Sequence, residues 1–111
     1  MKKILIVLIL SLTLCGCNNE KELNLETVMK ENKYVIVDVR TKEEYDESHL
    51  KESINIPYNE IDENIELDKE KVILVYCRSG NRSSIAYDTL TDLGYIVYDL
   101  GAFSKIDLPK E

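Results

Sequence analysis

The chain has 111 residues, enough for one compact domain but too few for two. Its 14 Lys and Arg stand against 21 Asp and Glu, which gives a formal net charge of −7. An acidic chain repels nucleic acid and anionic lipid head groups, so we expect no nucleic-acid partner.

The N-terminal residues have the pattern of a secretion signal. Two lysines precede an apolar run at residues 4–14, which is shorter than the roughly 20 residues that a membrane-spanning helix needs. The run leads into Leu-Cys-Gly-Cys, with Gly16 directly before Cys17, which resembles a bacterial lipoprotein signal. We therefore expect residues 1–16 to be a cleaved signal peptide and residues 17–24 to be the lipidated Cys17 with a short tether. The mature protein would be extracytoplasmic and held on a bacterial membrane by this lipid.

The three cysteines then separate into different roles. Cys15 leaves with the signal peptide, and Cys17 is used by the lipid. Cys77 remains as the single cysteine of the domain, without a disulfide partner in a compartment that favours disulfides. Such a thiol is a liability unless it is buried or used.

The first half of the domain alternates helix and strand. Apolar residues at helical spacing predict a helix that ends near residues 32–33. A continuous β-branched run predicts a strand at residues 34–39, buried on both faces. Thr41, with Glu44 three residues later, predicts a capping box that opens the next helix.

The second half continues this alternation. Pro57 stops a short extended piece at residues 53–57 and is followed by an expected short helix at 58–67. The remaining expected elements are a buried strand at 72–76, a helix at 83–93 and a strand at 95–100.

Strands that alternate with helices favour an α/β fold, with a mostly parallel central sheet flanked by helices on both faces. We assign residues 25–109 to this domain. Ligands of such sheets bind beyond the carboxyl ends of the strands. The loop that begins at Cys77 follows a strand and opens a helix, so it should lie at such an end.

The Cys77 loop combines several features that favour an anion and a thiolate. Arg78 and Arg82 flank the thiol, and positive surroundings stabilise the nucleophilic thiolate. The next helix is expected to begin near Ser83, so its free N–H groups point back into the loop. A buried structural cysteine would explain Cys77 alone but not its neighbours.

The turn inside the loop adds a second anion-binding element. Gly80 and Asn81 tolerate a positive φ, which lets successive backbone N–H groups curl inward around an anion. The residues therefore predict a stabilised thiolate that faces a small anion.

The segment Cys-Arg-Ser-Gly-Asn-Arg-Ser at 77–83 resembles the active-site loop of rhodanese-like sulfurtransferases. Matching upstream and downstream signatures are Val37-Asp38-Val39-Arg40, Glu43-Glu44-Tyr45, His49-Leu50, Asn55-Ile56-Pro57, Leu93-Gly94-Tyr95 and Leu100-Gly101. The resemblance implies a thiosulfate sulfurtransferase-like enzyme in which Cys77 takes sulfur from a small anionic donor and becomes a persulfide. A thiol, a protein sulfur acceptor or cyanide then removes the sulfur.

The resemblance also implies which residues do what. The substrate-binding residues would be Arg78, Ser79, Gly80, Asn81, Arg82 and Ser83. Asp38 and Arg40 would form a charge pair that supports the loop, and His49 would bond to backbone in a turn. No metal and no organic cofactor is implied, and the acidic residues 60–63 are explained by a solvated helix face.

Three alternatives stay open. Phosphatase relatives of the family carry one more residue between the cysteine and the arginine, whereas four residues separate Cys77 from Arg82 here. Loop length therefore favours sulfur over a small phosphatase, and an arsenate reductase has similar but weaker support. A persulfide carrier or binding module without efficient turnover is the remaining alternative. Ser48, Glu52 and Ala102 stand where the family often has Gly, and its usual downstream Trp is absent, with Phe103 nearby. These departures at the expected pocket rim and C-terminal turn leave the donor and acceptor preference open.

Overall fold

The computed structural model describes residues 24–111, and the expected signal peptide and lipidated Cys17 lie outside the described residues. The helices are α2 (Leu25–Glu31), α3 (Lys42–Glu47), α4 (Asn81–Asp92) and two 3-10 turns, η1 (Tyr58–Glu60) and η2 (Phe103–Lys105). The strands are β2 (Tyr34–Asp38), β3 (Ile54–Asn55), β4 (Val72–Cys77) and β5 (Ile96–Ala102). In residues 24–111, no helix combines the length and the hydropathy that crossing a bilayer requires.

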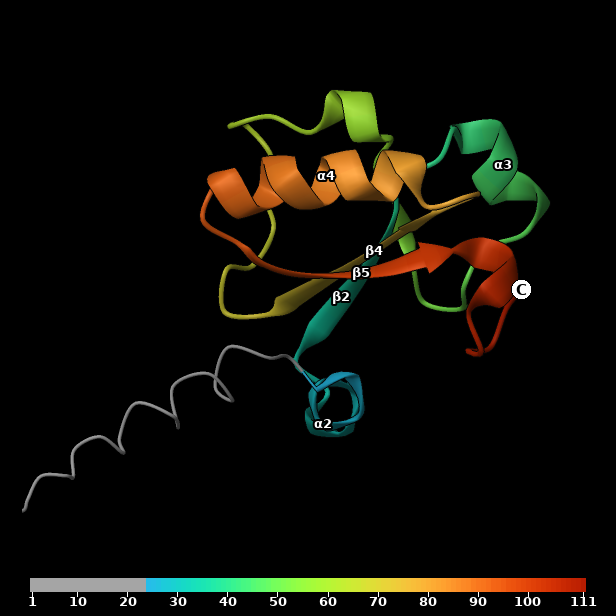
Figure 1. Ribbon diagram of the computed structural model, residues 1–111, viewed down its shortest axis with the longest axis horizontal. Coiled ribbons are helices and arrows are strands. Elements are labelled where there is room, and N and C mark those ends of the chain that lie inside the picture. Colours follow the sequence, from blue (N-terminus) through green and yellow to red (C-terminus); the bar gives the residue numbers. More distant parts are fainter. Residues whose placement is uncertain (1–23) are drawn as a thin grey trace, which may run out of the picture.

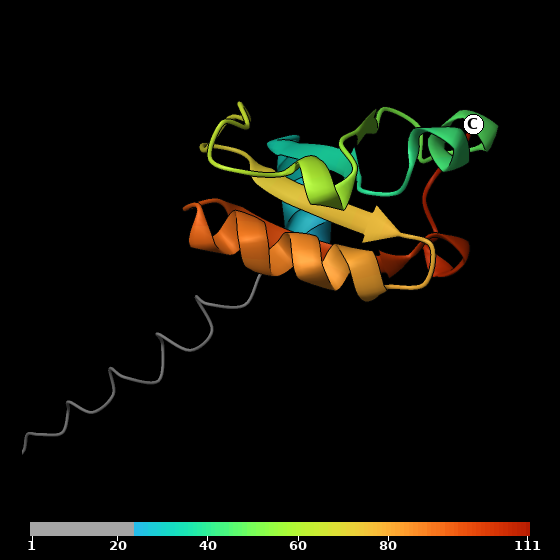
Figure 2. The same cartoon turned by 90° about the horizontal axis from the view of Figure 1, so that it is seen from above.

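The four strands form one parallel sheet in the order β3-β2-β4-β5. Figure 1 shows α4 along one side of the strands and α2 on the other, and the view in Figure 2 looks at the α4 side from above. The predicted α/β class, with a parallel sheet between helices, is confirmed.

Alternate residues of the central strands build two separate cores. Val37 and Val75 pack with Ala86 and Leu90 of α4 on one face. The neighbouring Ile36 and Leu74 point to the other face, where helix α2 and the C-terminal segment cover them. Burial on both faces explains why β2 and β4 read as continuous apolar runs.

The local predictions hold with three differences. The Thr41–Glu44 capping box is confirmed, with both reciprocal hydrogen bonds present. The helix expected at 58–67 is wrong: only η1 forms, and the side chain of Asp62 accepts from the N–H of Asn64 two residues later. Such local bonds compete with the helical ladder. Helix α4 also begins two residues earlier than expected, and β5 extends to Ala102.

The parallel arrangement gathers the ends of all four strands at one edge. Asp38 at the end of β2 lies opposite Tyr76 of β4 and Asn55 of β3 in the ladder. Cys77, the last residue of β4, lies opposite Ala102 of β5, and η2 follows directly. The chemically distinctive residues of the sequence therefore meet at the carboxyl edge of the sheet.

Candidate active site

The Cys77 sulfur lies in a cradle made by the loop that follows it. The backbone N–H groups of Gly80 and Ser83 donate to Sγ at 3.0 and 3.2 Å. The thiol donates to Ser83 Oγ at 3.4 Å, and that hydroxyl donates to the Gly80 carbonyl. Cys77 and Ser83 are both fully buried. Donors aimed at one sulfur stabilise negative charge on it, as thiolate or persulfide chemistry requires.

Gly80 allows the loop to close in this way. It is the N-cap of α4 with φ +102°, and a Cβ placed there would contact nothing within 4 Å. The expectation of a positive φ at Asn81 is wrong, because Asn81 is already the first residue of α4. The first turn of α4 thus supplies the Ser83 N–H directly to the sulfur.

Arg82 does not stand free beside the thiol. Its Nη1 and Nη2 donate to both carboxylate oxygens of Glu44 at 2.8 and 3.1 Å. This bidentate pair joins α3 to α4, and it lowers the pKa of Glu44 to about 2. The same carboxylate raises the pKa of Arg82. The charge of Arg82 is therefore largely neutralised, and its clearest role is to fix the first turn of α4.

The Glu44–Arg82 pair predicts a pH-dependent loss of stability. Glu44→Gln keeps a side-chain oxygen that accepts from the Thr41 N–H but removes the negative charge. The variant should therefore lose about 1 kcal/mol of folding stability at neutral pH. The pKa of Glu44 is lowered from its ordinary 4.5 to about 2 on folding, so this stabilisation is complete above pH 4.5. It should disappear as the pH falls from 4.5 to about 2, where wild type and variant converge. Urea unfolding followed by circular dichroism at several pH values measures this, with exposed Glu43→Gln as the control. A gap that stays constant down to pH 2 would refute it.

The exposed side of the loop borders a cavity of about 470 Å³. Its lining residues are Arg40, Glu44, Glu47, Ser48, Arg78, Ser79, Phe103 and Ser104. Arg78 and Ser79 are exposed, whereas Cys77 is not among the lining residues. The cavity is therefore a cleft above the loop, and the sulfur lies beneath its floor.

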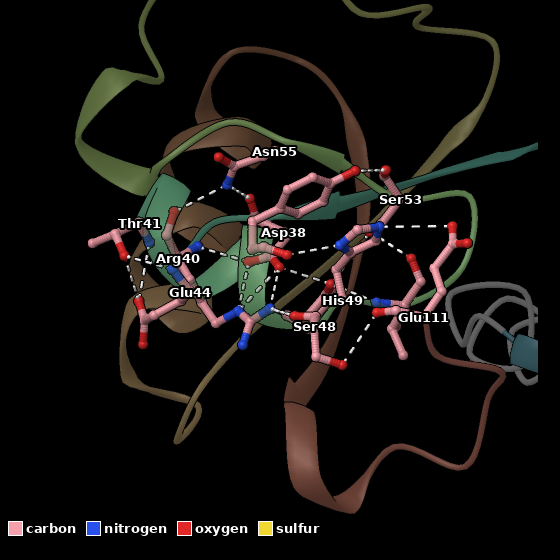
Figure 3. Close-up of polar contacts among 12 residues, drawn as sticks. Asp38, Arg40, Thr41, Glu44, Ser48, His49, Ser53, Asn55 and Glu111 are labelled. Carbon is pink, nitrogen blue, oxygen red and sulfur yellow. Dashed lines mark hydrogen bonds and ion pairs between the residues drawn. The ribbon is translucent and has the colours of Figure 1, made fainter.

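A buried ion pair forms another part of this edge. Asp38 accepts from the backbone N–H, Nε and Nη2 of Arg40, with the Nη2 contact at 2.6 Å, and from the Tyr76 hydroxyl at 2.8 Å. Figure 3 shows these contacts converging on the carboxylate. Burial alone would lower the pKa of Arg40, but the bonds to Asp38 raise it. Because Tyr76 precedes Cys77, this pair anchors the strand that carries the thiol. The arrangement supports the loop through Nε and Nη2 of Arg40, and it leaves Nη1 outside the pair.

His49 lies in the turn after α3. Its Nδ1 is 2.7 Å from the Tyr45 carbonyl, its ring stacks on Tyr45 at 3.8 Å, and its Nε2 is 3.7 Å from a Glu111 carboxylate oxygen (Figure 3). None of these contacts involves the thiol. The geometry therefore gives His49 a place in the turn and no contact with Cys77. Among residues 24–111, no three His, Cys, Asp or Glu side chains gather as a metal site would require.

Sequence reasoning missed several residues of the site. Glu44 was expected as a capping residue and as part of a signature, but its pairing with Arg82, which spans 38 positions, was not. Phe103 was expected near the pocket rim, but its stacking against the Arg40 guanidinium, whose Cζ is 4.4 Å from the ring centroid, was not. Glu47 and Ser104 complete the cleft. The pattern of acidic residues on the 42–48 helix was the one available signal.

The family of the chain follows from its match to known proteins. Residues 23–106 match the model of the rhodanese-like domain, which covers the loop, the Asp38–Arg40 pair and all four strands. The chain belongs to the rhodanese-like family.

Individual members of the family give the same result. Thiosulfate sulfurtransferase PspE of Escherichia coli is 37% identical over 78 residues, which cover 67% of this chain and 75% of PspE. A structure of rhodanese with anions from E. coli is 35% identical with a TM-score of 0.65, and the match covers 70% of this chain and 96% of that one. The adenylyltransferase and sulfurtransferase uba4 of Ogataea parapolymorpha is 37% identical over 78 residues, 68% of this chain but only 20% of uba4. The rhodanese-like domain of this chain is thus similar to thiosulfate sulfurtransferases and to one part of a larger enzyme.

Proposed function

We propose that the protein is a single-domain sulfurtransferase, which moves sulfane sulfur from a small anionic donor such as thiosulfate to a thiol or cyanide acceptor. The observation that carries this proposal is the pair of N–H groups that donate to the Cys77 sulfur within a loop of rhodanese length. The similarity to PspE supports thiosulfate as the class of donor.

In the first half of the cycle, the Cys77 thiolate attacks the outer sulfur of thiosulfate. The S–S bond of the donor breaks, sulfite leaves with the electron pair, and Cys77 becomes a persulfide. In the second half, the acceptor attacks the outer sulfur of this persulfide and restores the thiolate. The N–H groups of Gly80 and Ser83 hold negative charge on the cysteine sulfur in both halves.

The test is the intact mass of the full chain, purified in detergent, before and after incubation with thiosulfate. We expect a gain of about one sulfur atom, reversed by cyanide and absent in Cys77→Ser. An unmodified wild-type chain with any of several sulfane donors would contradict the proposal.

Two competing functions predict different results. A persulfide carrier would load one sulfur per chain but would release it only slowly to small acceptors. An assay with excess thiosulfate and cyanide would then show little or no multiple turnover. A phosphatase would hydrolyse a chromogenic phosphate ester in a manner lost in Cys77→Ser. The four-residue spacing between Cys77 and Arg82 favours sulfur over phosphate.

We further propose that the protein is exported and anchored to a bacterial membrane by lipid on Cys17. The support is the sequence pattern of residues 1–17 alone. Cys17→Ala should leave an unprocessed precursor in a membrane fraction, whereas Cys15→Ala should be processed normally. A mature, membrane-bound form of Cys17→Ala would refute the lipid site.

A further inference from the structure

The charges that line the cleft above the Cys77 loop differ from those expected of a plain anion site. Two arginines and two glutamates line it, in a chain with a net charge of −7. A dianion gains from the arginines but is repelled by the carboxylates. The cleft is therefore built for something other than the sulfur donor alone.

The ion pairs of the described residues leave one charge of each sign without a partner in the cleft. Glu44 is neutralised by Arg82, and Arg40 by Asp38. Arg78, on the β4–α4 loop, and Glu47, at the end of α3, take part in no ion pair or side-chain hydrogen bond among residues 24–111. The Glu44–Arg82 bond joins α3 to the first turn of α4, directly after the loop that carries Arg78, and Figure 1 shows α3 beside the loop after β4.

Arg40 adds a donor at the same place. Its side chain is only 6% exposed, and its Nε and Nη2 are used by Asp38 and the Ser48 carbonyl. Its Nη1 makes no hydrogen bond among the described residues, and Figure 3 shows this nitrogen on the side away from Asp38. A buried guanidinium that lines a cavity with one free edge is a ready donor for a carboxylate.

We propose that the cleft selects a small zwitterionic thiol, of the α-amino-acid type, as the sulfur acceptor. Arg78 and the free edge of Arg40 bind its carboxylate, and Glu47 binds its ammonium group. This deepens the sulfurtransferase function proposed above and rests on it. Opposite fixed charges on two walls discriminate between thiols by charge pattern, as a purely cationic cleft cannot.

The transfer step is balanced without a further reagent. The acceptor thiolate attacks the outer sulfur of the Cys77 persulfide, forming a new S–S bond on the acceptor. The S–S bond to Cys77 breaks, and its electron pair stays on the cysteine sulfur as thiolate. The proton of the persulfide leaves with the acceptor persulfide.

The experiment separates sulfur loading from sulfur release. The full chain is loaded with thiosulfate, freed of donor, and discharged in single turnovers followed by intact mass. Four acceptors are compared at equal thiolate concentration: L-cysteine, 3-mercaptopropionate, cysteamine and 2-mercaptoethanol. We expect L-cysteine to discharge the persulfide about 10-fold more efficiently than the other three. S-methylcysteine, which cannot react, should inhibit the discharge competitively.

Glu47→Lys supplies the decisive comparison. The variant should load sulfur at least as fast as wild type, because it loses a charge that repels the thiosulfate dianion, but it should lose the advantage of L-cysteine and favour 3-mercaptopropionate instead. Glu43→Lys makes the same charge change one turn earlier on α3, outside the cleft, and should keep the wild-type order of acceptors.

The outcomes distinguish the two proposals. Normal loading with equal discharge by all four thiols would overturn the zwitterion site and leave the sulfurtransferase function standing. If Glu47→Lys keeps the wild-type order of acceptors, the zwitterion site is also overturned. A cleft that serves a protein thiol would give this result. Failure to load sulfur at all would overturn both.

Discussion

Replacing Asp38 with alanine should destabilise the protein by about 3–5 kcal/mol, because it leaves the Arg40 guanidinium buried without its counter-charge. Asp38 is fully buried, and its carboxylate accepts from Arg40 and from the Tyr76 hydroxyl. Folded domains have only about 5–15 kcal/mol of stability, so this single change removes much of it. Urea unfolding followed by circular dichroism measures the loss.

Asp46→Ala is the matched control, since it also removes an aspartate that pairs with a cation. Asp46 is bonded to Lys42 at 2.7 Å, but its side chain is 56% exposed. Water replaces such a pair, so we expect no measurable loss. Equal effects of the two substitutions would show that burial of the Asp38 pair contributes nothing.

Replacing Gly80 with alanine should slow persulfide formation at Cys77 about 10- to 100-fold, because it misplaces one of the two N–H donors that stabilise the attacking thiolate. A Cβ has room at this position, so the only penalty is the backbone φ of +102°. Relief of that strain rotates the Gly80 N–H away from the sulfur. The rate of sulfur loading from thiosulfate, measured by quenched-flow and intact mass, tests this.

Gly94→Ala controls for strain without touching the cradle. Gly94 lies just after the other end of α4 with φ +99°, and its Cβ would approach only the flexible end of Lys69. Both variants should lose about 1–2 kcal/mol of folding stability. Only Gly80→Ala should lose sulfur loading. Equal loading rates in the two variants would show that the backbone conformation of Gly80 does not contribute to the chemistry.

The fold was predictable because its signals are local. The β-branched runs that became β2 and β4, and the capping box at Thr41, each lie within a few consecutive residues. The expected helix at 58–67 failed because its apolar spacing was real but the Asp62 side chain accepts from the nearby Asn64 N–H instead. Ile61 and Ile65 still reach the core from turns.

The site was only partly predictable. The position of Cys77 after a buried strand and before a helix placed it at the carboxyl edge of the sheet, where it lies. The partner of Arg82 and the stacking of Phe103 on Arg40 depend on segments far apart in the chain. No local pattern encodes such pairings. The sequence therefore suggested that both arginines of the loop are unpaired, whereas Arg82 is paired with Glu44 in the structure.

Because Cys77 is completely buried, the size of a reagent should affect how readily it reacts with this thiol. A large molecule that approaches the loop meets Arg78 and Ser79 before it can reach the sulfur. Mixed disulfides with cysteines on flat protein surfaces should therefore form slowly. In an oxidising environment this steric shield would preserve a reduced thiol between catalytic cycles.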